Sequence, residues 1–284
     1  MTVNVDTTDT TDTTDTSSVG EEYEVRYLVI NGTSDPITRV SCIHACYDIS
    51  WTNEASAPAL APGEPSPVQT LRAVVLRQDL WHVSFLRSGS MYADMITSRW
   101  DVPVGNKGSL CVIALFASKF YVLPPQSWYK SFSYDLPFWP KANHEEVSSH
   151  SPDDERCETS GQKKVYGVGV NEDIKGSFVV INATNGPITD VVVVHTCNGK
   201  DDSFSHSIMP KDAVSPIKSL NSATWHEDIW SVSFKTADGQ TKSRQGKGCD
   251  YQRGDSPQVC LVILYPRDFS IVDPSSDGCF FNHY

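Results

Sequence analysis

The sequence predicts an all-β protein made of two tandem homologous β-sandwich domains from an internal duplication, with a disordered N-terminal tail. Residues 27–46 read YLVINGTSDPITRVSCIHAC and residues 178–197 read FVVINATNGPITDVVVVHTC, with ten identities over positions 29–46. Two further blocks repeat in the same order, which makes the match extend over most of each copy. A repeat of this length indicates duplicated domains rather than a solenoid of short units.

Composition places the boundaries of the two copies. Residues 1–22 form a Thr- and Asp-rich tail, which cannot bury enough apolar surface to offset its ordering entropy, so we expect disorder there. Copy one is expected at 23–140 and copy two at 174–284. The polar, turn-rich stretch 141–173 between them is typical of an exposed linker.

The first strand of each copy is predicted from a run of β-branched residues. Residues 23–31 and 176–182 have this composition, and each run ends at turn-forming residues around an Asn-x-Thr sequence. Asn31 and Asn182 are also glycosylation sequons, but a threonine two residues after each asparagine has another use. Its hydroxyl satisfies a local backbone group in a tight turn.

Alternation identifies the strands that carry tryptophan. In 80–85 it places Trp81 and Phe85 on one face, and in 229–234 it does the same for Trp230 and Phe234, so we assign these four side chains to the two cores.

Continuous apolar runs predict strands that are buried on both faces. They occur at 109–116 and 258–265, and the four valines at 191–194 predict a third strand of this kind or close to it. No segment shows a sustained helical period. Short strands separated by turns favour a β-sandwich in each copy.

The net charge of −12 lies mostly outside the folded parts. The tail contributes −6 and residues 139–174 contribute −4, so both copies are nearly neutral. Without a broad basic surface, binding to a nucleic-acid backbone is excluded as the expected function. The first residues lack the features of a signal peptide, and no apolar stretch reaches the length of a membrane-spanning helix. We therefore expect a soluble, cytoplasmic protein, with unconventional secretion as the alternative.

Eight cysteines without a CxxC motif argue against a zinc ribbon or a thioredoxin-like site. In a reducing cytosol they are expected to be free thiols. Two pairs occur at matched positions, and we assign them to the cores and consider them as cross-strand neighbours that could form disulfides under oxidising conditions. These pairs are Cys46 with Cys111, and Cys197 with Cys260. Cys249 and Cys279, which have no counterparts, are a further candidate pair.

Two His-x-Cys sequences present a nitrogen and a sulfur on one strand face. They are His44–Cys46 and His195–Cys197, and such a face can bind a metal ion or pack as a hydrogen-bonded imidazole beside a small thiol. Cys42 adds a third group in copy one, but Val193 replaces it in copy two. Because the set differs between the copies, we favour packing and predict no metal and no cofactor.

The sequence has no GxSxG, HExxH or P-loop motif. Asp79 and Asp228 precede the paired tryptophans at matched positions, where turn or strand-end roles are expected. An enzyme without a recognisable motif is left open.

Two segments supply candidate ligand-binding residues. The aromatic stretch 120–139 offers rings that can stack on sugars, lie at a membrane interface or pack against the protein. The basic loop 241–254 can bind an anion or form a solvated hairpin. The candidates are Trp128, Tyr129, Tyr134, Trp139, Lys242, Arg244, Lys247 and Arg253.

The strand plan is similar to that of small fungal β-sandwich proteins such as aegerolysins and actinoporin-like lectins, which act at membranes or glycans. The resemblance covers strand pattern and no motif residue. With the duplication, it favours a non-catalytic binding protein, lectin-like, recognising carbohydrate or membrane-surface lipid head groups through loops at the sandwich ends. A structural or protein–protein interaction role for the 120–139 segment is the alternative.

Overall fold

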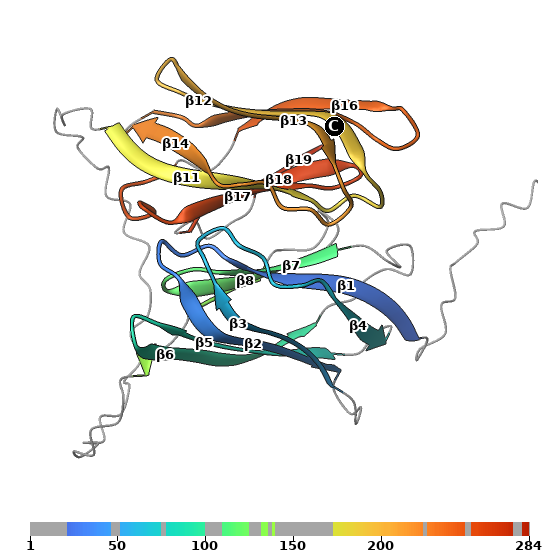
Figure 1. Ribbon diagram of the computed structural model, residues 1–284, viewed down its shortest axis with the longest axis vertical. Helices are drawn as coiled ribbons and strands as arrows, with labels where there is room; N and C mark the ends of the chain where they lie inside the picture. Colours follow the sequence, from blue (N-terminus) through green and yellow to red (C-terminus); the bar gives the residue numbers. More distant parts are fainter. Residues whose placement is uncertain are drawn as a thin grey trace, which may run out of the picture.

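The computed structural model confirms the all-β class and shows two similar pairs of packed sheets (Figure 1). Every regular element in the described part of the chain is a strand. The residues that the structure describes are 22–46, 52–74, 78–99, 110–124, 132–135, 138–139, 173–223, 226–247, 251–274 and 280–283. Residues 1–21 of the predicted tail and 141–172 of the predicted linker lie outside these ranges, whereas Glu22 begins β1 and Asp173 begins β11.

Copy one consists of two five-stranded sheets. Sheet A has the order β4-β1-β7-β8-β9, and sheet B has the order β10-β6-β5-β2-β3. The strands are β1 (Glu22–Asn31), β2 (Ile37–Cys46), β3 (Thr52–Leu60), β4 (Gln69–Val74), β5 (Gln78–Arg87), β6 (Ser90–Arg99), β7 (Leu110–Leu115), β8 (Lys119–Leu123), β9 (Phe132–Asp135) and β10 (Phe138–Trp139).

Copy two repeats this arrangement with one strand fewer among the described residues. Sheet C has the order β14-β11-β17-β18-β19, and sheet D has the order β13-β12-β15-β16. The strands are β11 (Asp173–Asn182), β12 (Ile188–Cys197), β13 (Lys200–Met209), β14 (Lys218–Ala223), β15 (Ile229–Lys235), β16 (Thr241–Lys247), β17 (Val259–Leu264), β18 (Asp268–Val272) and β19 (Phe280–His283).

The duplication preserves details of register as well as strand order. In each copy the first strand pairs in parallel with the long apolar strand, β1 with β7 and β11 with β17, although the other pairs are antiparallel. Each copy also has an irregularity early in its second strand, where Arg39 and Asp190 both have a φ of 51°. A non-glycine residue rarely adopts a positive φ, so its recurrence at matched positions identifies a β-bulge inherited by both copies.

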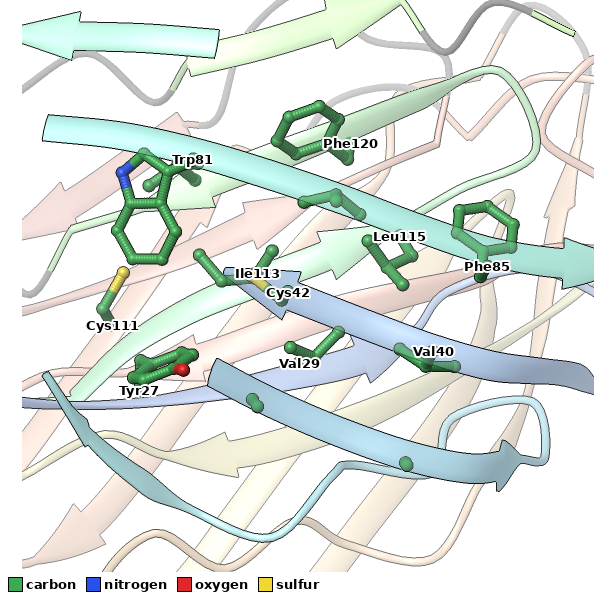
Figure 2. Packing of buried hydrophobic residues seen from close by; sticks show 14 of the residues in the cluster. Tyr27, Val29, Val40, Cys42, Trp81, Phe85, Cys111, Ile113, Leu115 and Phe120 are labelled. Carbon is green, nitrogen blue, oxygen red and sulfur yellow. The ribbon is translucent and has the colours of Figure 1, made fainter. Parts of the chain in front are cut away.

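Each copy has its own core between its two sheets. In copy one, Trp81 and Phe85 from sheet B pack toward Tyr27, Val29 and the β7 side chains of sheet A (Figure 2). In copy two, Trp230 and Phe234 lie in the equivalent core. All four large rings have at most 1% of their surface exposed.

A third apolar core joins the copies, because sheets A and C pack against each other (Figure 1). Side chains alternate along each inner strand, so Cys111 and Ile113 of β7 face the core of copy one while Val112 and Ala114 face copy two. The molecule is therefore a stack of four sheets in the order B, A, C, D. This arrangement explains the continuous apolar runs of β7 and β17, which are buried along their whole length.

The prediction that the valines at 191–194 are buried on both faces is wrong. Val191 and Val193 are buried, but Val192 is 40% exposed. These residues belong to β12 in sheet D, an outer layer of the stack, so only one face of the strand meets a core.

Contacts between the copies are partly reciprocal. The turn at Gly63 of copy one lies against Val179 of β11, and the matching turn of copy two, at Asp212, forms an ion pair with Arg26 of β1. Gly63 has a φ of +72°, and a Cβ there would lie 2.9 Å from the Val179 side chain, so this close approach requires glycine. The backbone N–H of Val259 also donates to the carbonyl of Gly32 across the interface, at 2.9 Å. The pattern is that of two copies related by an approximate two-fold axis.

Candidate functional site

The turn after the first strand of copy two is fixed by the side chain of Asn182. Its Nδ2 donates to the carbonyls of Gly186, Met209 and Pro210 at 2.9–3.1 Å. Its Oδ1 accepts from the N–H and the hydroxyl of Thr184, and that hydroxyl donates to the Gly186 carbonyl at 2.8 Å. Asn182 is fully buried, so the Asn-x-Thr sequence acts here as a turn that holds the end of the sandwich. Asn31 and Thr33 make the corresponding bonds in copy one.

A pocket of about 430 Å³ opens beside this turn in copy two. Three segments form it: the turn that follows β11, the β15–β16 hairpin and the β17–β18 turn. The lining residues are Thr184, Asn185, Gly186, Pro187, Thr236, Ala237, Asp238, Gln240, Lys242, Pro266 and Arg267. Loops carried by a rigid sandwich are a common place for binding sites, and this lining contains no aromatic ring.

In copy one an ion pair occupies the equivalent place. Arg87, at the end of β5, donates from Nε to Asp35 Oδ2 at 3.0 Å, and its Nη2 lies 2.9 Å from the same oxygen. The counterparts in copy two are Thr236 and Gly186, which cannot form this pair. The two copies therefore differ at this end of the sandwich, and copy two leaves room for a ligand.

The hairpin beside the pocket also differs between the copies. Copy one connects β5 and β6 through Ser88 and Gly89, both at positive φ. In copy two, Thr236 N–H donates to the Gln240 carbonyl around a loop of three residues that ends at Gly239, with a φ of 80°. The longer loop extends Ala237 and Asp238 over the rim of the pocket.

The charges around the pocket favour an anion. Lys242 reaches Gln240 Oε1 at 3.3 Å, and Arg267 is exposed in the β17–β18 turn. The single carboxylate in the lining, Asp238, accepts a hydrogen bond from the Thr236 hydroxyl. That bond and the loop's N–H groups lower the pKa of Asp238. Two cations and one carboxylate already engaged by its own loop leave a net positive pocket.

Of the residues predicted to bind a ligand, only Lys242 lines this pocket. Arg244 is exposed further along β16, Lys247 ends that strand, and Arg253 is exposed in the loop before β17. Arg267 and the Thr184–Pro187 turn were not predicted from the sequence. An alignment of the two copies would point to this end of the sandwich, because Gly186 replaces Asp35 and the β15–β16 hairpin of copy two is one residue longer than the β5–β6 hairpin.

The aromatic candidates are distributed differently. Trp128 and Tyr129 lie outside the described residues. Tyr134 belongs to β9, which pairs with β8, and Trp139 belongs to β10, which pairs with β6. The structure therefore places Tyr134 and Trp139 on edge strands of copy one.

A second polar cluster lies inside copy two, around Asp228. Its carboxylate is 2.8 Å from His195 Nε2, accepts from the Ser222 hydroxyl at 3.0 Å, and accepts from the Tyr251 N–H at 2.5 Å. His195 is fully buried and its ring lies 4.7 Å from that of Trp230. Without access to solvent these groups serve to anchor the 251–255 loop and β14 to the core.

The predicted relation between the matched cysteines is wrong. Cys197 ends β12 in sheet D, whereas Cys260 lies on β17 in sheet C, so the two are not cross-strand neighbours. Both are buried free thiols, as is Cys111. Burial, followed by the Asp228 carboxylate, raises the pKa of Cys197 to about 11. The side chain of Cys46 and the pair Cys249 and Cys279 lie outside the described part.

Comparison of the chain with models of known protein families and with curated proteins found no match to either. In the described ranges no helix is long and apolar enough to cross a membrane. No three His, Cys, Asp or Glu side chains in those same ranges are grouped in a way that would hold a metal ion.

Proposed function

We propose that this protein is a non-catalytic binding protein that takes an anionic glycan or lipid head group into the end pocket of copy two. The observation that carries the proposal is that pocket itself, with Lys242 and Arg267 on different segments of its wall. A cation pair with adjacent backbone and hydroxyl groups is suited to a carboxylate, sulfate or phosphate.

Because the pocket lining has no aromatic ring, we expect recognition by hydrogen bonds and charge and not by ring stacking. Hydrogen bonds from Asn185 and Gln240 would select the ligand, and charge would strengthen binding. The Arg87–Asp35 pair fills the matching place in copy one, so we expect one ligand per chain rather than two.

A glycan array that includes sialylated and sulfated sugars, together with sedimentation on phosphatidylserine and phosphatidylinositol-phosphate vesicles, tests this proposal. Binding should weaken by at least about tenfold when Lys242 and Arg267 are both changed to alanine, because two charge-assisted contacts are lost. Lys235→Ala is the matched control, since Lys235 lies on the same hairpin, pairs with Asp190 and is not part of the pocket lining.

A gain of charge gives a second test. Gly186→Asp restores the carboxylate of copy one, and a Cβ at Gly186 meets only the Ala237 side chain at 3.5 Å, so the fold should tolerate it. This variant should bind anions more weakly and unfold like the wild type. The proposal would be refuted if neither the glycan array nor the vesicle sedimentation showed binding. It would also be refuted if neither the Lys242 and Arg267 double variant nor Gly186→Asp changed the binding.

A further inference from the structure

The outer sheets of the two copies, B and D, have different edge strands. In copy one, β6 is covered by β10, in which Phe138 pairs with Tyr92 and Trp139 with Met91. In copy two the equivalent strand is β16, and it is the last strand of sheet D among the described residues. In copy one Phe85 pairs with Tyr92, and in copy two the counterpart Phe234 pairs with Lys242. Lys242 therefore occupies the position of Tyr92, which β10 covers in copy one.

Among the described residues no strand is hydrogen-bonded to the outer edge of β16, although β19 of sheet C lies near it. Thr236 N–H donates to the Gln240 carbonyl, and the bonded positions alternate from there along an antiparallel ladder. The residues bonded to β15 are therefore Lys242, Arg244 and Gly246. The N–H and C=O groups of Ser243 and Gln245 point outward, as an incoming strand requires.

The side chains of β16 determine which strand fits. Lys242 and Arg244 lie opposite Phe234 and Val232, so they share one face of the sheet, and Lys247 adds a third cation to a strand without any carboxylate. Two β16 strands paired edge to edge would place cations against cations, which disfavours self-association. An acidic strand would instead have its carboxylates beside these cations.

We propose that the free edge of β16 binds an extended acidic segment of a partner protein by strand addition, in the place that β10 fills in copy one. This site adjoins the end pocket and shares Lys242 with it, but Ser243, Arg244 and Gln245 are not among the pocket-lining residues.

Fluorescence anisotropy with a labelled peptide of alternating glutamate and threonine, about eight residues long, tests the proposal. The full chain should bind it. Ser243→Pro removes one outward N–H and leaves the β15–β16 ladder intact, so affinity should fall about tenfold, whereas Ser243→Ala should bind like the wild type. Gln245→Pro should repeat the loss, and circular dichroism melts identify any variant that fails to fold.

Further variants separate strand addition from simple charge attraction. Arg244→Glu should reduce binding of the acidic peptide, and Arg267→Ala, in the end pocket, should leave it unchanged. Equal binding by folded Ser243→Pro and Ser243→Ala would overturn the proposal, since the edge N–H would then play no part. Binding only after removal of residues 1–21 would also overturn it, because the acidic tail of the chain itself would then be the occupant.

Discussion

Truncating Leu261 would test whether the face between the two copies is a true core. Leu261 is fully buried in the core shared by sheets A and C, whereas Leu264 on the same strand is fully buried in the core of copy two. A buried leucine changed to alanine loses the transfer free energy of its removed carbons and leaves a cavity, at a cost of about 3–5 kcal/mol. At a solvent-facing strand position the same change costs less than about 0.5 kcal/mol.

Urea unfolding of both variants, followed by tryptophan fluorescence, would provide the comparison. We predict that Leu261→Ala and Leu264→Ala lower the free energy of unfolding by similar amounts, about 3–5 kcal/mol each. Hydrogen exchange should show faster exchange in β7 of copy one as well as β11 of copy two for Leu261→Ala, because its cavity borders sheets A and C. If Leu261→Ala cost less than about 0.5 kcal/mol while Leu264→Ala cost several, the shared core would be refuted.

Three further predictions concern the buried polar groups. Asp228→Ala removes the carboxylate that His195, Ser222 and the Tyr251 N–H share, so urea unfolding should show a loss of about 3–5 kcal/mol in the free energy of unfolding. A loss as small as that of the exposed Asp201→Ala would count against the cluster. Asn182→Ala removes the turn's central side chain and should cost about 2–4 kcal/mol in the same assay, whereas Asn185→Ala at the exposed turn position should be nearly neutral. Burial raises the pKa of Cys197 to about 11, so the folded state holds its proton more tightly than the unfolded state does. The free energy of unfolding should therefore fall as the pH rises from 9 to 11, and burial raises the pKa values of Tyr27, Cys42 and Tyr251 in the same direction. A flat stability profile over that pH range would contradict the raised thiol pKa.

The sequence was sufficient for the fold class and the duplication because both depend on local patterns. Alternation around Trp81 and Trp230 identifies a strand with one buried face, and the runs at β7 and β17 identify strands with two. The run at 191–194 has the same composition but faces solvent on one side, because sheet D is an outer layer. Composition alone does not show which sheets are covered on both faces, because that depends on how the two copies pack against each other.

The candidate pocket could be predicted only in part for a similar reason. Lys242 was identified from the basic composition of residues 241–254, which the sequence assigns to a loop and the structure places partly on β16. Arg267 lies in a turn that approaches Lys242 only in the folded sandwich. His195 and Asp228 are also distant in sequence, although Trp230, two residues after Asp228, marks that strand as part of a core. The most informative sequence signal is the position-by-position difference between the copies. Gly186 in place of Asp35 distinguishes the end of copy two, which has the pocket, from the end of copy one, which the Arg87–Asp35 pair fills.

Differential scanning calorimetry of the full chain tests most directly whether the two copies form one body. A shared core predicts a single transition in which the van't Hoff enthalpy equals the calorimetric enthalpy of the whole chain. Two separate transitions, each reproduced by a copy expressed alone, would contradict it.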